Sequence, residues 1–301
     1  LEQLAGDLDA PLRVGVRGRP GAGVRTVVRA LQAAGMTVCA PDPGPDLAPD
    51  PAPELEVRVV VETITAEDTS ALSPGRPTVV VLNKADLIGF TGAGPMAAAV
   101  ARCREVRRRT SVPAVPLSAL VALAALDPAG LDDDLLDPLR ALARGPAQLS
   151  ARVRGRLLAR LDLFGIANAV AALRGGADRI AVRAALRRVS GVDAVCAEID
   201  RAAAPVRYRR MTAVLTALTG MGAGPAGIRL AELMAGDDVV LARMAAAVEV
   251  LAAAGMPMPR AADPLRMAID WQRYAAGPVS ELHRSCGLDL TRGALRLWDR
   301  R

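Results

Sequence analysis

Residues 78–86 have the sequence TVVVLNKAD, and the order of residue types in this stretch decides the fold class. Apolar and β-branched residues come first, and the polar residues Asn83, Lys84 and Asp86 follow. A short, continuous apolar run that is bounded by polar residues is typical of a strand buried on both faces of a parallel sheet. The stretch therefore predicts an α/β protein with a cluster of polar residues directly after a buried strand.

A glycine-rich loop lies upstream of this strand, at residues 18–26, with the sequence GRPGAGVRT. An apolar run of strand length precedes the loop at residues 12–16, and residues 26–34 have the pattern of a helix that Gly35 can end. Strand, glycine-rich turn and helix form the setting of a phosphate-binding loop, in which backbone N–H groups and the helix N-terminus surround the phosphates. The sequence thus predicts such a turn near the N-terminus.

The loop keeps the glycines of the phosphate-binding motif G-x-x-x-x-G-K-[ST] but has lost the motif's charged and metal-binding residues. Gly18 and Gly23 occupy the two glycine positions. Val24 stands where the motif has lysine, Arg25 stands at the metal-binding hydroxyl, and only Thr26 agrees with the longer form G-K-S-T. An apolar side chain cannot pair with phosphate, and a guanidinium competes with Mg²⁺. We therefore do not expect the loop to hold Mg²⁺.

A third segment, Ser118-Ala119-Leu120, follows another short strand. Lys84 is the only lysine among the 38 basic residues, so its place in N-K-x-D is improbable as a coincidence. These segments resemble the guanine-specificity motif N-K-x-D and the S-A-L loop of the P-loop GTPases, and the architecture resembles the Era-like and bacterial dynamin-like families. The resemblance covers roughly residues 11 to 125.

The resemblance implies a role for each matching residue. Asp86 accepts hydrogen bonds from the guanine N1–H and amine, Asn83 braces the loops, and Lys84 packs over the ring. The Ala119 N–H meets the guanine carbonyl oxygen. A carboxylate selects guanine because adenine lacks that pair of donors. The expected site for GTP or GDP comprises Gly18, Gly21, Gly23, Arg25, Thr26, Asn83, Lys84, Asp86, Ser118 and Ala119.

The segments that perform hydrolysis in this family are not found in the sequence. Residues 41–54, PDPGPDLAPDPAPE, contain six prolines and no D-x-x-G, which indicates a shortened or missing switch region. Residues 62–68 are predicted to be a loop that enters a helix, with Thr65 as N-cap and Asp68 completing a near capping box. We therefore assign no catalytic residue and no metal ligand. Two alternatives stay open: Arg25 supplies the phosphate cation, or guanine binding is lost as well.

The pattern changes beyond Gly145, where apolar residues recur at helical spacing and no further strand is predicted. We therefore expect two domains: a GTPase-like domain over residues 1–145, with a mostly parallel sheet and a reduced switch region, and an all-helical bundle over residues 146–301. Asp263 and Ser280 are predicted helix starts in the second half.

Composition limits the remaining function classes. Half of the chain is apolar (51%) but only 2% is aromatic, and the net charge of +6 rests on arginine, which is typical of a GC-rich genome. Four scattered cysteines and the lone His283 argue against a metal site or a histidine-based catalytic site. No segment has the sequence of a signal peptide or a transmembrane helix. We expect a cytoplasmic protein, and the arginine-rich helical faces suit a peripheral contact with a membrane surface.

Three functions follow as hypotheses. The favoured one is a pseudo-GTPase, a catalytically impaired GTPase-like protein that regulates or scaffolds by pairing with a competent GTPase of the same family. The second is a slow GTP-binding and hydrolysing enzyme with a non-standard loop. The third is an RNA- or ribosome-associated assembly factor, for which a charge of +6 over 301 residues is weak support, so a nucleic-acid partner is not expected.

Overall fold

The structure is a computed structural model of the whole chain. It describes Gly6, Leu8 and residues 10–39, 52–72, 75–89, 94–220, 224–258 and 263–300. The chain forms two compact units, one of residues Leu12–Ile199 and one of Leu1–Pro11 with Asp200–Arg301. Each unit is described by itself below.

The first unit contains a five-stranded sheet in the order β2-β1-β3-β4-β5, and every pairing in it is parallel. The strands are β1 (Val14–Gly18), β2 (Val38–Cys39), β3 (Leu55–Val61), β4 (Thr78–Asn83) and β5 (Ala114–Leu117). The predicted α/β class with a parallel sheet is confirmed. Because the strands are parallel, all their carboxyl ends lie at one edge of the sheet.

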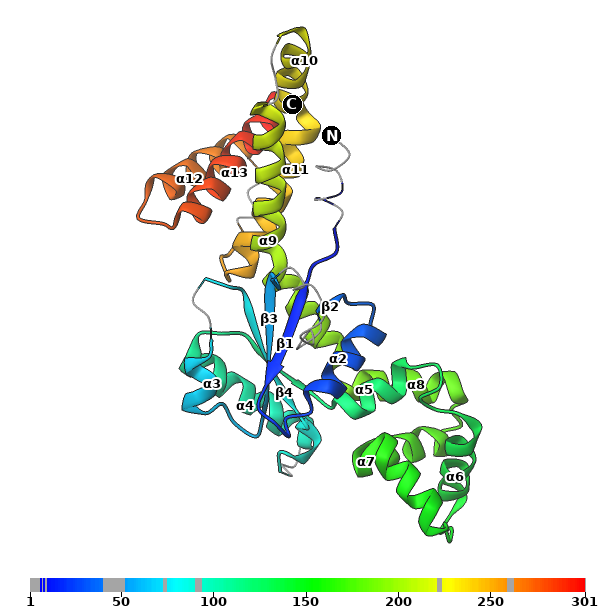
Figure 1. Cartoon of the computed structure of the whole chain (residues 1–301). Coiled ribbons are helices and arrows are strands. Elements are labelled where there is room, and N and C mark those ends of the chain that lie inside the picture. The colour runs from blue at the N-terminus through cyan, green and yellow to red at the C-terminus, as the bar shows by residue number, and fades with distance from the viewer. Residues whose placement is uncertain are drawn as a thin grey trace, which may run out of the picture. The chain divides into compact units, whose positions relative to one another are not determined.

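Helices cover both faces of this sheet, which explains the apolar runs of its strands (Figure 1). On one side lie α2 (Val24–Ala33) and α5 (Ala119–Leu126), and on the other lie α3 (Ala66–Ser70) and α4 (Pro95–Thr110). Every residue of β4 is buried. The core between the sheet and α4 includes Val60, Val80, Leu82, Ala99, Cys103 and Val106.

The predicted capping box at the start of α3 is confirmed. The Thr65 side chain accepts a hydrogen bond from the Asp68 N–H, and the Asp68 carboxylate accepts one from the Thr65 N–H. The reciprocal bonds satisfy two N–H groups that the first turn of a helix leaves without backbone partners. This fixes the chain direction directly after β3.

Three further helices, α6 (Asp133–Arg144), α7 (Ala151–Arg174) and α8 (Arg179–Ser190), belong to the same compact unit as the sheet. Helix α5 packs against both α7 and α8, and the leucines of α6 and α7 form the core between them. The change to helical structure expected at residue 145 therefore lies inside one unit, whose boundary falls at Ile199. The reason is that α5 has a second apolar face, which α7 and α8 cover.

The second unit is helical in its described residues. Helix α9 (Val192–Gly220) passes into it from Asp200 onward, and α10 (Gly224–Ala235), α11 (Asp237–Ala253), α12 (Pro264–Ala276) and α13 (Glu281–Asp299) complete it. The predicted starts at Asp263 and Ser280 are confirmed as N-caps of α12 and α13. The core of this unit includes Ala204, Tyr208, Val250, Leu251, Trp271, Cys286 and Leu290.

Two observations concern the whole described part of the chain. None of its helices is both long and apolar enough to cross a membrane. Its four cysteines form no disulfide, and Cys103 and Cys286 are buried. Burial raises the pKa of the Cys103 thiol to about 12 and that of Cys286 to about 11, so both thiols stay protonated near neutral pH.

Candidate functional site

The fold brings the three sequence segments of the expected nucleotide site to one edge of the sheet. The glycine loop follows β1, the N-K-A-D segment follows β4, and Ser118 follows β5. The register pairs Gly18 with Val59, and Asn83 with both Val61 and Leu117, so these strands end side by side. In open parallel sheets, ligands bind outside the carboxyl ends of the strands where the strand order reverses, which here lies between β1 and β3.

The glycines of the loop are required by its geometry. Gly23, the N-cap of α2, has φ 82°, and a Cβ atom there would lie 2.5 Å from Asn83 Nδ2. A Cβ atom on Gly18 would lie 2.6 Å from the Val59 carbonyl oxygen of the neighbouring strand. Both close approaches exclude a side chain. The glycines therefore have a structural duty that does not depend on a ligand.

Asn83 joins the glycine loop to the start of α5. Its Nδ2 donates to the Ala22 carbonyl at 2.8 Å, and its Oδ1 accepts from the Ala119 N–H at 3.2 Å. The side chain is 3% exposed, so both hydrogen bonds are shielded from water. One amide group thus fixes the relative positions of the loops after β1, β4 and β5.

The segment after β5 is buried by the turn between α8 and α9. The Ser118 N–H donates to the Ser190 carbonyl at 2.9 Å, and a Cβ atom on Gly191 would lie 2.6 Å from the Pro116 carbonyl oxygen. Ser118 and Ala119 are each 2% exposed. The Ala119 N–H, which the resemblance assigns to the guanine carbonyl, is already used by Asn83. Contact with a base therefore requires this donor to be shared or released.

Lys84 and Asp86 differ in their surroundings. Lys84 is exposed, has φ 56° and lines the same pocket as the glycine loop. Asp86 is half-buried in the short 3-10 helix η1 (Ala85–Leu87), and it is not among the residues that line this pocket. Lys84 therefore lies on the side of the glycine loop, whereas Asp86 occupies a separate position at the same edge of the sheet.

A pocket of about 950 Å³ lies over the glycine loop. In the described part of the chain, its lining contains cationic side chains and no carboxylate: Arg17, Arg19, Arg25, Arg58 and Lys84. Val24 and Thr26, at the start of α2, also line the pocket. Such a pocket is suited to a strongly anionic group, because backbone N–H groups at a helix start and guanidinium groups both stabilise negative charge.

Arg58 was missed by sequence reasoning, although a signal was present. It lies with Glu56 inside β3, a strand that is otherwise apolar, and two charged residues in a buried strand indicate a special role. Glu56 is 2% exposed, and its Oε1 lies 3.9 Å from Arg58 Nε. The structure gives neither of these two atoms a hydrogen bond within the described residues. In the register of the sheet, Arg58 is the partner of Arg17.

Arg19 was also missed, and it ties the glycine loop to the capped helix α3. Its Nη2 lies 3.3 Å from Asp68 Oδ2. Asp68 is 1% exposed and also accepts hydrogen bonds from the backbone and hydroxyl of Thr65. The carboxylate next to the loop is therefore committed to Arg19 and to a helix cap. It is not arranged as a ligand for a divalent cation.

The residues at the glycine loop fit the phosphate groups of the expected nucleotide better than they fit Mg²⁺. The cation-lined loop fits a phosphate group. Arg25 is exposed at the position where the motif carries a metal-binding hydroxyl, which does not fit Mg²⁺. Among the described residues, no group of three or more His, Cys, Asp and Glu side chains can hold a metal ion. The expected absence of the switch region concerns residues 41–54, of which residues 41–51 lie outside the described part of the chain.

Comparison of the sequence with protein-family models and with curated proteins finds no match.

Proposed function

We propose that this chain is a degenerate GTPase-like protein that binds a guanine nucleotide without efficient hydrolysis and acts as a regulatory or scaffolding subunit. One observation carries the proposal: the buried Asn83 amide links the carbonyl of Ala22 to the N–H of Ala119. This is the bracing role that the resemblance implies for the asparagine of N-K-x-D. It supports the nucleotide-site interpretation because three separate motif segments meet at one side chain.

The chemistry of the pocket supports binding without metal-assisted turnover. Arginine side chains supply positive charge where Val24 replaces the motif lysine. Arginine binds phosphate oxygens through two parallel hydrogen bonds, so it can hold a phosphate without Mg²⁺. Phosphoryl transfer in this class depends on Mg²⁺ and on a residue that orients water. The residues that line the pocket include no carboxylate for either purpose.

The regulatory part of the proposal follows from the resemblance. GTPase domains of this superfamily commonly associate through the face that binds the nucleotide. A copy with impaired hydrolysis is suited to pairing with a competent GTPase of the same family. In this proposal, the partner GTPase contacts the face on which the pocket over the glycine loop opens.

The test is a titration of the full chain with fluorescent GTP and ATP analogues, with and without Mg²⁺. We expect GTP to bind more tightly than ATP and Mg²⁺ to change the affinity little. Asp86→Ala should remove the preference for guanine, and Arg25→Met should weaken both nucleotides. Arg29→Met is the matched control, because Arg29 is exposed on the same helix and does not line the pocket. Equal binding of GTP and ATP by the unmodified chain would contradict the proposal.

A slow enzyme is the second candidate, favoured by the presence of Arg25 and Thr26 at the pocket wall. This alternative predicts Mg²⁺-dependent release of phosphate from GTP, abolished by Asp86→Ala. Turnover that does not respond to Asp86→Ala would contradict this candidate, because it would not depend on the guanine contact.

A further inference from the structure

A second pocket, of about 740 Å³, lies in the helical unit between the end of α9 and helices α10, α11 and α13. Its apolar lining includes Met234, Val240, Leu295 and Trp298, and its charged lining consists of three arginines and two aspartates, namely Arg243, Arg292, Arg296, Asp289 and Asp299. Pockets of a few hundred cubic ångströms that are mostly apolar, with a few convergent polar groups, are typical of small-molecule sites. This pocket has that composition and shares no residue with the glycine loop.

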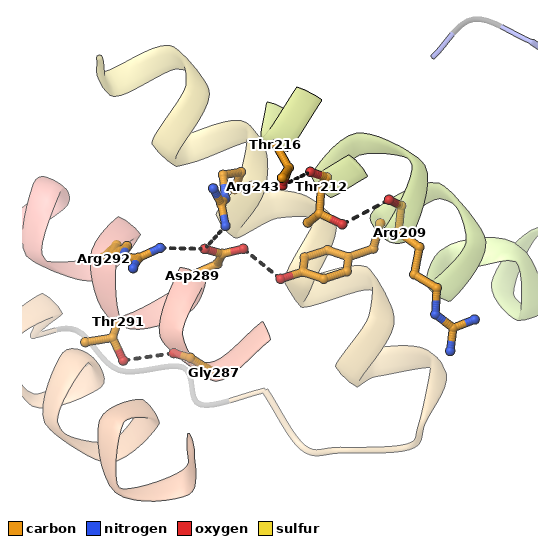
Figure 2. A network of polar contacts seen from close by, with 9 residues as sticks. Arg209, Thr212, Thr216, Arg243, Gly287, Asp289, Thr291 and Arg292 are labelled. Atoms are coloured by element: carbon orange, nitrogen blue, oxygen red, sulfur yellow. Dashed lines mark hydrogen bonds and ion pairs between the residues drawn. The ribbon is translucent and has the colours of Figure 1, made fainter. Parts of the chain in front are cut away.

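Asp289 organises the polar side of the pocket. Its carboxylate, on α13, is 2% exposed and accepts a hydrogen bond from the Tyr208 hydroxyl at 2.7 Å. Arg243 Nη2 lies 2.9 Å and Arg292 Nη1 3.4 Å from the same Oδ1 atom. Figure 2 shows the two guanidinium groups meeting at Asp289 from different helices. Burial and the bond to Asp289 raise the pKa of Tyr208, so its hydroxyl remains a donor.

The positive charge of this cluster exceeds its negative charge. Two guanidinium groups face a single carboxylate, and each has several N–H donors in a planar fork. Arg243 Nε is buried and has no hydrogen-bond partner within the described residues. The side chain of Arg292 is 61% exposed and is therefore accessible from the pocket. Asp289 therefore neutralises only one of the two positive charges of Arg243 and Arg292.

The apolar side leaves large side chains accessible. Leu295 is 43% and Trp298 50% exposed, and they lie three residues apart on α13, on the side of the helix that lines the pocket. Residues at this spacing are neighbours on a helix surface. Arg292 lies three residues before Leu295, so a cationic side chain and the two apolar side chains follow each other along one helix face.

We propose that this pocket binds an anionic amphiphile, a molecule with an alkyl chain that ends in a carboxylate or phosphate. The acid group pairs with Arg243 and Arg292, and the chain lies against Met234, Leu295 and Trp298. Free fatty acids and alkyl phosphates share this chemistry with the lipids of a membrane, so the experiment has to separate the two sources. The proposal is independent of the nucleotide site.

The experiment uses the full chain and the fluorescence of Trp298, with Trp271→Phe as a background in which Trp298 is the only tryptophan. Decanoate and decyl phosphate are titrated below the concentrations at which they form micelles. We expect a saturable blue shift with one site per chain. Decanol and decyltrimethylammonium should bind about tenfold more weakly or worse, the factor that corresponds to one charge-assisted hydrogen bond.

A pair of arginine variants tests the polar contact. Arg292→Met should weaken decanoate binding about tenfold while leaving the affinity for decanol unchanged. Arg266→Met is the matched control, because Arg266 is exposed on α12, pairs with Asp270 and does not line the pocket. Circular dichroism is the check that both variants are folded, which we expect because both side chains are largely exposed.

Three outcomes overturn the proposal. The first is equal affinity for decanoate and decanol, and the second is the absence of saturable binding of the soluble acids. The third is binding to phosphatidylglycerol vesicles without binding of decanoate or decyl phosphate, which would place the lipid contact on the surface of the unit and not in this pocket.

Discussion

The side-chain amide of Asn83 donates a 2.8 Å hydrogen bond to the carbonyl of Ala22, a residue 61 positions earlier in the chain. The same side chain accepts a hydrogen bond from the Ala119 N–H. Because all of these groups are buried, the contact has both a stability role and an organising role at the edge of the sheet. Replacing Asn83 therefore tests whether the edge is held together as proposed.

Asn83→Ala should lower the free energy of unfolding by about 2–4 kcal/mol, because it leaves a buried carbonyl and a buried N–H unpaired. The measurement is urea unfolding followed by circular dichroism. Lys84→Ala is the control, because the Lys84 side chain is exposed and the substitution requires no change of the backbone conformation. We expect it to change the free energy of unfolding by no more than about 0.5 kcal/mol. Similar values for the two variants would contradict a bracing role for Asn83.

Gly21 and Gly23 form a second matched pair. Both have positive φ, 84° and 82°, so alanine at either position costs about 1–2 kcal/mol in backbone strain. At Gly21 nothing lies within 4 Å of an added Cβ, whereas at Gly23 the Cβ meets Asn83 Nδ2. We expect Gly23→Ala to be clearly the more destabilising of the two in urea unfolding. Equal costs would show that the loop moves away from Asn83 without a penalty.

The buried pair of Glu56 and Arg58 should show strong coupling. Removal of one partner of a buried ion pair leaves an uncompensated charge and costs about 3–5 kcal/mol. We expect Glu56→Leu and Arg58→Met each to be more destabilising than the double variant in a double-mutant cycle followed by urea unfolding. Additive effects of the two substitutions would show that the 3.9 Å contact contributes nothing to stability.

The stability of the protein should fall in alkaline solution because of Cys103. Burial raises the pKa of this thiol from 9.0 to about 12, so between these values the unfolded chain loses a proton that the folded chain keeps. The contribution of Cys103 to the free energy of unfolding is fully present below pH 9. It decreases as the pH rises, with a slope of at most about 1.4 kcal/mol per pH unit. Urea unfolding of the unmodified chain and of Cys103→Ala between about pH 8 and pH 10 measures it. The variant should show the shallower slope, and parallel slopes would exclude Cys103 as the cause.

The polar cluster of the helical unit should depend more on Asp289 than on Tyr208. Tyr208→Phe removes one hydrogen bond and should cost about 1 kcal/mol. Asp289→Ala leaves Arg243 without its ion pair and should cost about 3–5 kcal/mol. Asp270→Ala, which breaks an exposed pair with Arg266, should cost less than about 1 kcal/mol. Thermal unfolding ranks the three variants, and a different order would contradict the assignment of Asp289 as the organising group.

Local patterns in the sequence predicted several of the elements and some of the helix starts. The apolar run before Asn83 predicted a buried strand, and the Thr65–Asp68 spacing predicted a helix start that the structure confirms. Such features depend on neighbours within a few residues. The extent of the first unit was not accessible in this way, because the second apolar face of α5 has no signature that tells which later helices will cover it.

The sequence by itself determined the α/β class, the parallel strands and the glycine turn, because these follow from periodicity and from the backbone freedom of glycine. Only the tertiary structure decided which polar groups meet. Arg17, Arg58 and Lys84 come from three different strands or their ends and line one pocket because of the strand order, which no local pattern encodes. Likewise, Arg243 and Arg292 meet at Asp289 only after the helices have packed.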